Sequence, residues 1–352
     1  MGSFGSALLI GLFVVAAVVI WVAGVSLADA TDALDARLGF GEALGGLVLL
    51  GVATSLPELA ITASAALAHH LELAVGNLIG GIAIQTVVLA ALDARGPAER
   101  PLSYLVGSLT LVIEAATVIV VVVIAIAGTQ LPQSANLAGV SPASVAIFAS
   151  WILGLVTVNR MRRRSAWEVK APGATPGRKR KTETHPHKPR PFSGKPMLMV
   201  VMVFAAAGVM TLAAGYVLEE SGNTLASRAG LGAGVFGATV IAAATALPEL
   251  STGFAAVKLG DYQLAMSDIF GGNGFMPALF LLADLLGGTP ALVSAKATDV
   301  WLAGLGALVT AVYLIAIVLR PQRTRLRLGL DSRLVIAIYA LGILGLAVIP
   351  ST

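Results

Sequence analysis

Two glutamates inside long apolar segments, Glu58 and Glu249, are the residues of this sequence most suited to do chemistry. Each follows a proline, in the phrases Thr54-Ser55-Leu56-Pro57-Glu58-Leu59 and Thr245-Ala246-Leu247-Pro248-Glu249-Leu250. An intramembrane carboxylate costs roughly 3 kcal/mol or more, so such a glutamate indicates a functional site. Proline has no N–H and loosens the helix, which allows polar backbone to face a cavity at that depth.

Cation binding is the chemistry that suits this pair. Two unpaired carboxylates facing each other would repel, and one would take up a proton. A hard divalent cation resolves the repulsion, because Ca²⁺ takes about six to eight oxygens from carboxylates, carbonyls and water. The carbonyls of Thr54 and Thr245, freed by the prolines downstream, are suitable neutral ligands. The other interpretation is that each Pro-Glu pair only ends a helix, and its occurrence twice in register disfavours this.

The two phrases belong to an internal repeat. Glu58 to Glu249 is 191 residues, and Asn77 to Asp268 is the same offset. Identical pairs at this offset include Thr54/Thr245, Leu56/Leu247, Pro57/Pro248, Glu58/Glu249, Leu59/Leu250, Leu73/Leu264, Ala74/Ala265, Gly80/Gly271 and Gly81/Gly272, and Arg37/Arg228, Gly46/Gly237 and Asp93/Asp284 extend the match outward. Matches of Leu and Ala are common by chance in membrane proteins, whereas aligned Pro-Glu and Gly-Gly pairs are not.

The second part of each repeat supplies further candidates for the cation site. Runs of small residues, at 76–81 and 267–274, permit close helix approach or local unwinding. Asn77 and Asp268 are the neutral and acidic versions of one position, and both are candidate metal ligands. The other candidate transport-site residues are Ser55, Gln85, Asn273, Gly81, Gly272 and Glu114.

Two of these candidates have a more specific expectation. Gln85 lies one helical turn past Gly81 and is expected to face the same cavity, whereas its counterpart is Met276. Glu114, within another apolar segment, is either a proton-relay group or a group that binds a neighbouring helix. Outside the site, we expect Asp93 and Asp284 to cap helix ends, and His69 and His70 to be solvated in a turn.

Composition identifies an integral membrane protein. The chain is 57% hydrophobic and 12% charged, against about 25% charged residues in soluble domains. It has no cysteine, which excludes disulfides, thiolate metal sites and cysteine nucleophiles. Residues 160–195 hold 12 of the 23 Lys and Arg and two of the 19 Asp and Glu, so the rest carries a formal charge of −6. The basic character is therefore confined to one loop and does not indicate a surface that binds nucleic acid.

Ten segments are long enough to cross a membrane, given that about 20 apolar residues span ~30 Å of hydrocarbon. They are residues 4–27, 39–67, 72–92, 103–127, 141–159, 197–218, 230–257, 263–286, 299–319 and 333–350. No Lys or Arg precedes Arg37, so the first segment is a retained helix rather than a signal peptide.

The distribution of positive charge predicts the orientation. With the loop 160–195 in the cytoplasm, 21 Lys and Arg lie on that side and only Arg228 and Lys296 on the other. Both termini are then outside, and we expect a prokaryotic plasma membrane. The loop has the composition of a disordered segment. Its arginines beside a helix end suit contact with anionic lipid.

Five segments precede the loop and five follow it, so the second half enters the membrane from the opposite side. The predicted fold is therefore an all-α integral membrane protein, with ten helices in two inverted-topology repeats. Residues 1–159 form the first repeat, 160–195 the linker and 196–352 the second repeat. Secondary transporters use this arrangement, with a site near the midplane at the repeat interface.

The paired Thr-x-Leu-Pro-Glu-Leu and Gly-rich phrases resemble the α-repeats of the calcium/cation antiporter superfamily, which includes sodium/calcium and calcium/proton exchangers. The resemblance covers nearly the whole chain. It implies that Glu58 and Glu249 are the calcium-binding carboxylates and that Thr54 and Thr245 contribute carbonyls. It also implies that the second, third, seventh and eighth segments form the site, while the long first and sixth segments slide across it.

Departures from the family pattern leave the coupling ion open. Where the family commonly reads Gly-Ser-Asn, this chain has glycine at 81 and 272, so two hydroxyls are missing. Sodium-coupled members carry Asn or Asp at the positions of Gln85 and Met276, which weakens the case for several Na⁺ sites. With glutamine at position 85, the chain resembles calcium/proton exchangers, in which the two glutamates themselves could carry the protons.

We therefore expect a secondary antiporter that exchanges Ca²⁺ for H⁺ or Na⁺ by alternating access. Its partners are inorganic cations and the lipid bilayer, with no cofactor. The alternative on the same scaffold is a sodium/proton exchanger, and a remote one is an intramembrane carboxylate enzyme. A channel is similarly disfavoured, and a pump is disfavoured because no Gly-rich ATP motif is present.

Overall fold

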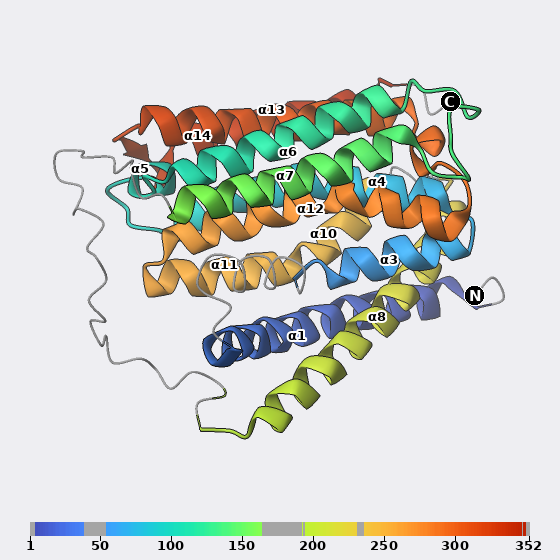
Figure 1. Cartoon of the computed structure of the whole chain (residues 1–352), viewed down its shortest axis with the longest axis horizontal. Coiled ribbons are helices and arrows are strands. Elements are labelled where there is room, and N and C mark those ends of the chain that lie inside the picture. The colour runs from blue at the N-terminus through green and yellow to red at the C-terminus, as the bar shows by residue number, and fades with distance from the viewer. Residues whose placement is uncertain are drawn as a thin grey trace.

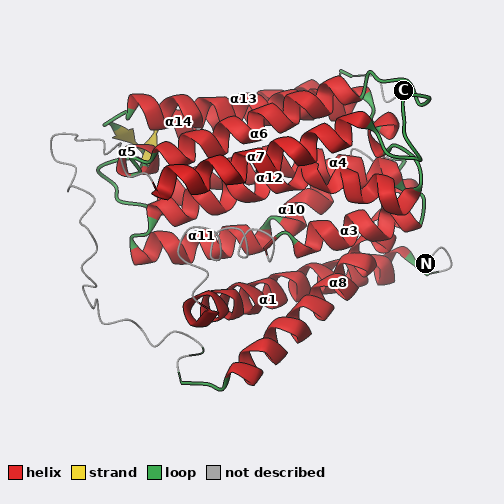
Figure 2. Ribbon diagram, viewed as in Figure 1, coloured by secondary structure: helices red, strands yellow, loops and turns green. Residues whose placement is uncertain are grey.

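The computed structural model of the chain describes residues 4–38, 54–163, 192, 194–230, 236–346 and 348–349. Most of this part is α-helix, and the long helices run along the length of the molecule (Figures 1 and 2). The strands among the described residues are one antiparallel pair, β1 (Thr324–Arg325) and β2 (Leu328–Gly329). The prediction of an all-α architecture is confirmed.

The elements follow the order of the two repeats. The first half contains α1 (Ser6–Leu38), α3 (Leu56–Leu67), α4 (Leu71–Arg95), α5 (Leu102–Leu105), α6 (Leu109–Gly128) and α7 (Pro142–Arg163). The second half contains α8 (Met197–Arg228), the π-helical turn Gly237–Ile241, α10 (Ala242–Thr245), α11 (Leu247–Leu259), α12 (Tyr262–Gly287), the 3₁₀ turn Ala291–Ser294, α13 (Ala297–Leu319) and α14 (Leu330–Leu346).

Seven of the described helices are long and apolar enough to cross a membrane. An eighth span results if the pair Gly237–Thr245 and Leu247–Lys258, bent by 43°, is counted as one crossing. The first part of the predicted segment 39–67 lies outside the described residues, and α14 has only 17 residues. The protein is integral to the membrane, and the count of ten crossings stays a prediction.

Several predicted boundaries were wrong. The first helix continues to Leu38 and the sixth to Arg228, because the helical backbone hydrogen bonds extend past the apolar stretch through a segment that contains polar and charged residues. Near the end of α1, Arg37 donates to the carbonyls of Phe192 (2.9 Å) and Lys195 (2.8 Å). The segment predicted at 103–127 is broken at 106–108, where α5 ends and α6 begins.

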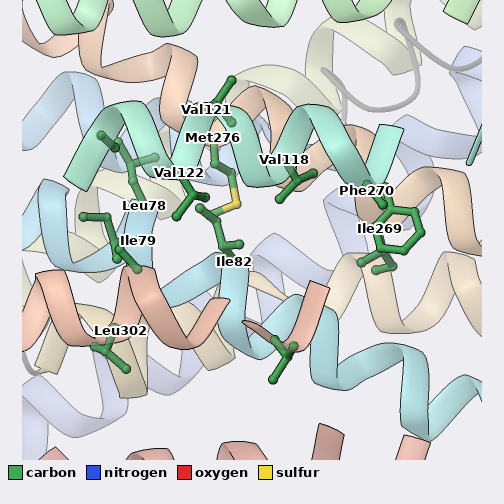
Figure 3. Packing of buried hydrophobic residues seen from close by; sticks show 14 of the residues in the cluster. Leu78, Ile79, Ile82, Val118, Val121, Val122, Ile269, Phe270, Met276 and Leu302 are labelled. Carbon is green, nitrogen blue, oxygen red and sulfur yellow. The ribbon is translucent and has the colours of Figure 1, made fainter. Parts of the chain in front are cut away.

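The main hydrophobic core lies between α4, α6, α12 and α13 (Figure 3). Leu78 and Ile82 from α4 meet Val118 and Val122 from α6, with Met276 of α12 beside them. Among the described residues, α1 and α8 contribute nothing to this core. They lie against one another along one side of the bundle (Figure 1) and contact the rest through smaller clusters. The bundle thus has a large core body and a separate helix pair, the α1–α8 pair.

Asp93 and Asp284, which are equivalent in the repeat, cap the starts of neighbouring helices rather than the ends of their own. Asp93 accepts hydrogen bonds from Leu102 N (2.8 Å), Gly329 N (2.7 Å) and Ser332 Oγ (2.7 Å). Asp284 accepts from Ala291 N (2.6 Å) and Ser141 N (2.8 Å). Each aspartate therefore ties the loop after its own helix to a helix start in the opposite repeat.

Candidate cation-binding site

The two Pro-Glu phrases stand at the first turns of α3 and α11, where a helix restarts. The break before α11 bends the chain by 43°, and a π-helical turn precedes it. Proline removes the N–H that would continue the ladder, and the next bonds are Leu59 N to Ser55 O (3.0 Å) and Leu250 N to Ala246 O (3.1 Å). Each glutamate thus lies at a helix N-terminus, whose partial positive charge favours an anion.

The structure brings residues of both repeats to one buried place. Glu58 and Glu249 are both fully buried. Gln85 Nε2 donates to Glu58 Oε1 at 3.3 Å, so Gln85 does face the glutamate as expected. Thr245, from the other repeat, interacts with the Glu58 carboxyl, although its hydroxyl donates to Ala242 O at 3.2 Å. Glu249 interacts electrostatically with Glu58 and with Asp268.

Most of the oxygens at this place lack a donor. Glu58 Oε2 and both oxygens of Glu249 have no hydrogen-bond partner in the part of the chain that the structure describes. The same holds for other buried polar atoms of the candidate set: Ser55 Oγ, Asn77 Oδ1 and Nδ2, Gln85 Oε1 and Asn273 Oδ1. An unsatisfied buried polar group costs about 1–3 kcal/mol, and more if charged. Such a concentration of acceptors suits a cation, which would coordinate them directly.

The remaining acidic candidates are held by neighbouring hydroxyls. Thr252 Oγ1 donates to Asp268 Oδ2 at 2.8 Å, which fixes α12 to α11. Glu114, on α6, accepts from Ser267 Oγ on α12 at 2.6 Å. This bond matches the expectation that Glu114 binds a neighbouring helix, and Ser267 precedes Asp268 in sequence. Glu114 is therefore joined to the residue next to Asp268.

A polar contact between the repeats was missed from the sequence. Asn273 Nδ2 donates to Thr86 Oγ1 (3.0 Å) and lies 3.4 Å from Ile82 O. Thr86 in turn bonds to Ile82 O (2.8 Å) and lies 3.4 Å from Thr310 Oγ1. Asn273 thus joins α12 to α4 through its amide nitrogen and keeps its oxygen available. Threonines in helices commonly bond to their own backbone, so the sequence carried no signal for Thr86.

Gly81 and Gly272, which are equivalent in the repeat, each face a residue of the other repeat. A Cβ on Gly81 would lie 2.2 Å from Met276 Cε, so the methionine methyl fills that space. A Cβ on Gly272 would lie 3.5 Å from Gln85 Oε1 and 3.6 Å from Ser55 Oγ. Because Gln85 and Met276 are equivalent in the repeat, the same contact occurs twice: a glycine of one repeat faces this position of the other repeat. The side chain at that position is polar in the first repeat (Gln85) and apolar in the second (Met276).

His70 is not simply solvated, as the sequence led us to expect. Its side chain is 36% exposed, and Nδ1 lies 2.9 Å from Oε1 of the fully buried Glu219 on α8. His69, its neighbour, is exposed as expected. The pairing joins positions 149 residues apart, for which no local spacing gives a signal.

Comparison with known proteins decides the family. The model of the sodium/calcium exchanger protein family matches residues 8–158 and 198–349, most of the chain. The chain belongs to this family. Its members are ion exchangers and need no cofactor, so the enzyme alternative is not retained and inorganic cations are the cargo.

Individual relatives agree with this placement. The chain is 26% identical over 270 residues to the inner membrane protein YrbG of Escherichia coli (strain K12), covering 77% of this chain and 75% of YrbG. Its fold is similar to that of the H⁺/Ca²⁺ exchanger CAX, with a TM-score of 0.66 and 15% identity over 98% of this chain and 82% of that one. The sodium-calcium exchanger NCX_Mj has a TM-score of 0.58 and 16% identity, covering 97% and 99%. The two-repeat exchanger fold is thereby confirmed.

Proposed function

We propose that this cation antiporter exchanges Ca²⁺ for H⁺ or Na⁺ at a site built from Glu58 and Glu249. The observation that carries the proposal is the set of orphaned acceptors around two fully buried carboxylates, one from each repeat. Ca²⁺ neutralises both carboxylates and takes neutral oxygens from the surroundings. Thr54, Thr245, Asn77 and Asp268 complete the set of proposed ligands.

Protons are the counter-ion that the surroundings of the site favour. Two protons on Glu58 and Glu249 carry the same charge as one Ca²⁺, so the carboxylates alone can balance the exchange. A site for several Na⁺ ions needs additional oxygens. At Gly81 and Met276 the space holds a thioether methyl in place of such oxygens.

Alternating access is the proposed transport cycle. The α1–α8 pair packs against the core body through a cluster that mixes alanines with larger apolar side chains, among them Ala16, Ala65, Ala74, Ala214, Ile20, Ile61 and Leu218. Movement of this pair across α3 and α11 would expose Glu58 and Glu249 to one side of the membrane at a time. Inverted repeats make the two end states similar in energy.

The proposed arrangement in the cell follows from charge. Residues 1–159 and 196–352 are the two repeats, and 160–195 is a cytoplasmic linker whose arginines contact anionic lipid. Figure 1 shows the start of α1 and the end of α14 at the same end of the bundle. This supports termini on one side of the membrane, which we place outside a bacterial plasma membrane.

Gradient-driven uptake into proteoliposomes tests the function. We expect Ca²⁺ accumulation that depends on a pH or Na⁺ gradient, and its loss in Glu58→Gln and in Glu249→Gln. Glu72→Gln is the matched control, since Glu72 is 44% exposed and pairs with Lys296 at the surface (3.0 Å). Retained transport in both buried variants would overturn the site. Gradient-driven Na⁺ flux without Ca²⁺ flux would favour the sodium/proton exchanger.

A further inference from the structure

A second group of metal-ligating side chains lies away from Glu58 and Glu249. Its members are His70, in the turn before α4, and Glu219 and Glu220 on α8. One donor atom from each lies within 4.8 Å of the others. Around a tetrahedral Zn²⁺ the donor atoms would be about 3.3 Å apart, so a modest change of side-chain rotamer would bring the three donors to this distance.

The buried carboxylate of Glu219 is the independent sign of a ligand. Glu219 is fully buried, and His70 accounts only for its Oε1. Its Oε2 is also buried, with no hydrogen-bond partner among the described residues. An ion pair between His70 and Glu219 alone gives no reason to bury the second carboxylate oxygen, Oε2, whereas a bound metal ion would coordinate that oxygen.

The repeat shows that the fold itself does not need these groups. The residue equivalent to Glu219 in the first half is Ala28, and the residue equivalent to His70 is Asp261. The same architecture is therefore built without a histidine or a buried glutamate at the matching place. The group is a local addition at one contact between the two repeats, with His70 from the first and Glu219 and Glu220 from the second.

We propose that His70, Glu219 and Glu220 form a binding site for a divalent transition metal, for which Zn²⁺ is the probe. One imidazole nitrogen with two carboxylates suits Zn²⁺ and its neighbours, whereas Ca²⁺ takes oxygen ligands alone. Asn223 Nδ2, 3.2 Å from His70 Nδ1 and 3.3 Å from Nε2, would help to orient the imidazole ring.

Bound metal would fasten α8 to the turn between α3 and α4. Because α8 belongs to the α1–α8 pair, the metal would hold that pair in one position against the core body. Zn²⁺ is then an inhibitor that acts away from the cation site. This consequence for transport rests on the proposed function, whereas the metal site itself does not.

Zn²⁺ titration of purified protein tests the site in a background that removes the main carboxylates. In Glu58→Gln/Glu249→Gln protein we expect one Zn²⁺ to bind, and calorimetry gives its affinity. His70→Ala and Glu219→Gln should each weaken binding about tenfold or more. His69→Ala, which changes the exposed neighbour, should leave the affinity unchanged. Absence of Zn²⁺ binding, equal affinity in all variants, or loss in His69→Ala would overturn the site.

Transport assays test the inhibition separately. Zn²⁺ should slow Ca²⁺ uptake by the wild-type protein and have little effect on His70→Ala. Competition at Glu58 and Glu249 would instead inhibit both proteins equally, and that result would overturn the proposed fastening. Because His70 is partly exposed, its variant should fold even if Glu219→Gln does not accumulate. If no Ca²⁺ transport is found, the titration still decides whether the metal site exists.

Discussion

Gly81 and Met276 show how one residue can depend on another that lies 195 positions away. The methyl of Met276 occupies the volume that a side chain at position 81 would need. Met276 is itself fully buried, beside Ile82 and Val122 (Figure 3). A side chain at 81 therefore requires the methyl end of Met276 to move, independently of any ion.

Gly81→Ala should destabilise the protein, by about 1–3 kcal/mol as for overpacking in other cores. The loss should be smaller when Met276→Ala is also present, because the two residues share one volume. Thermal unfolding of the purified single and double variants measures this coupling. Gly272→Ala is the control, since its Cβ would meet atoms only at ordinary contact distances. Equal losses at both glycines would contradict the explanation.

The sequence was a good guide to which polar residues lie buried together and a poor one to their hydrogen-bond partners. Glu58 and Glu249 were found because a charge in an apolar segment, repeated at one offset, has few explanations, and Gln85 was found because it is an amide one helical turn past Gly81. The pairing of His70 with Glu219, and of Ser267 with Glu114, was missed. Those contacts join separate helices, and no periodicity within one helix reports which face meets which neighbour.

At the scale of elements, the α1–α8 pair touches the core body through glycines that the repeat makes equivalent. A Cβ on Gly24 would lie 3.0 Å from Pro248, and one on Gly215 would lie 2.7 Å from Ala60 and 3.4 Å from Pro57 O. Gly24 and Gly215 are 191 residues apart. Each helix of the pair thus places a glycine against the Pro-Glu phrase, or the turn after it, of the opposite repeat.

Gly215→Ala should slow Ca²⁺ uptake and lower the melting temperature. Its Cβ would collide with the rigid methyl of Ala60, so α8 must move away from α3, at a cost of about 1–3 kcal/mol. Gly208→Ala on the same helix is the control, because the nearest atom to its Cβ would be Leu56 Cδ1 at 3.9 Å. Uptake and unfolding of the two variants are compared with those of the wild type. Similar effects at both positions would argue against a close sliding contact.

Helices were easier to predict from the sequence than their ends were. Apolar length identified nearly every long helix, because hydrocarbon demands it. It failed to place the polar ends of α1 and α8, and it missed the break between α5 and α6. Asp93 and Asp284 were expected at helix ends. Their actual role, binding backbone N–H groups across the repeats, depends on three-dimensional proximity.

At the scale of the whole molecule, the absence of cysteine makes the predicted orientation directly testable. Gln133, in the loop after α6, and Arg323, before β1, are both exposed and belong to opposite ends of the bundle. We expect Gln133→Cys to react with a membrane-impermeant maleimide on intact cells. Arg323→Cys should react only after the cells are permeabilised. The reverse pattern would place the linker outside and contradict the charge argument.

The ties made by Asp93 bear on how the protein is made. Its Oδ2 binds groups 236 and 239 residues further along the chain, at Gly329 and Ser332. The ribosome delivers those residues long after Asp93. The first repeat is therefore made while this carboxylate lacks two of its three partners, and its packing is completed only when β2 and α14 arrive. In biogenesis, the arrival of α14 is thus expected to lock the first repeat.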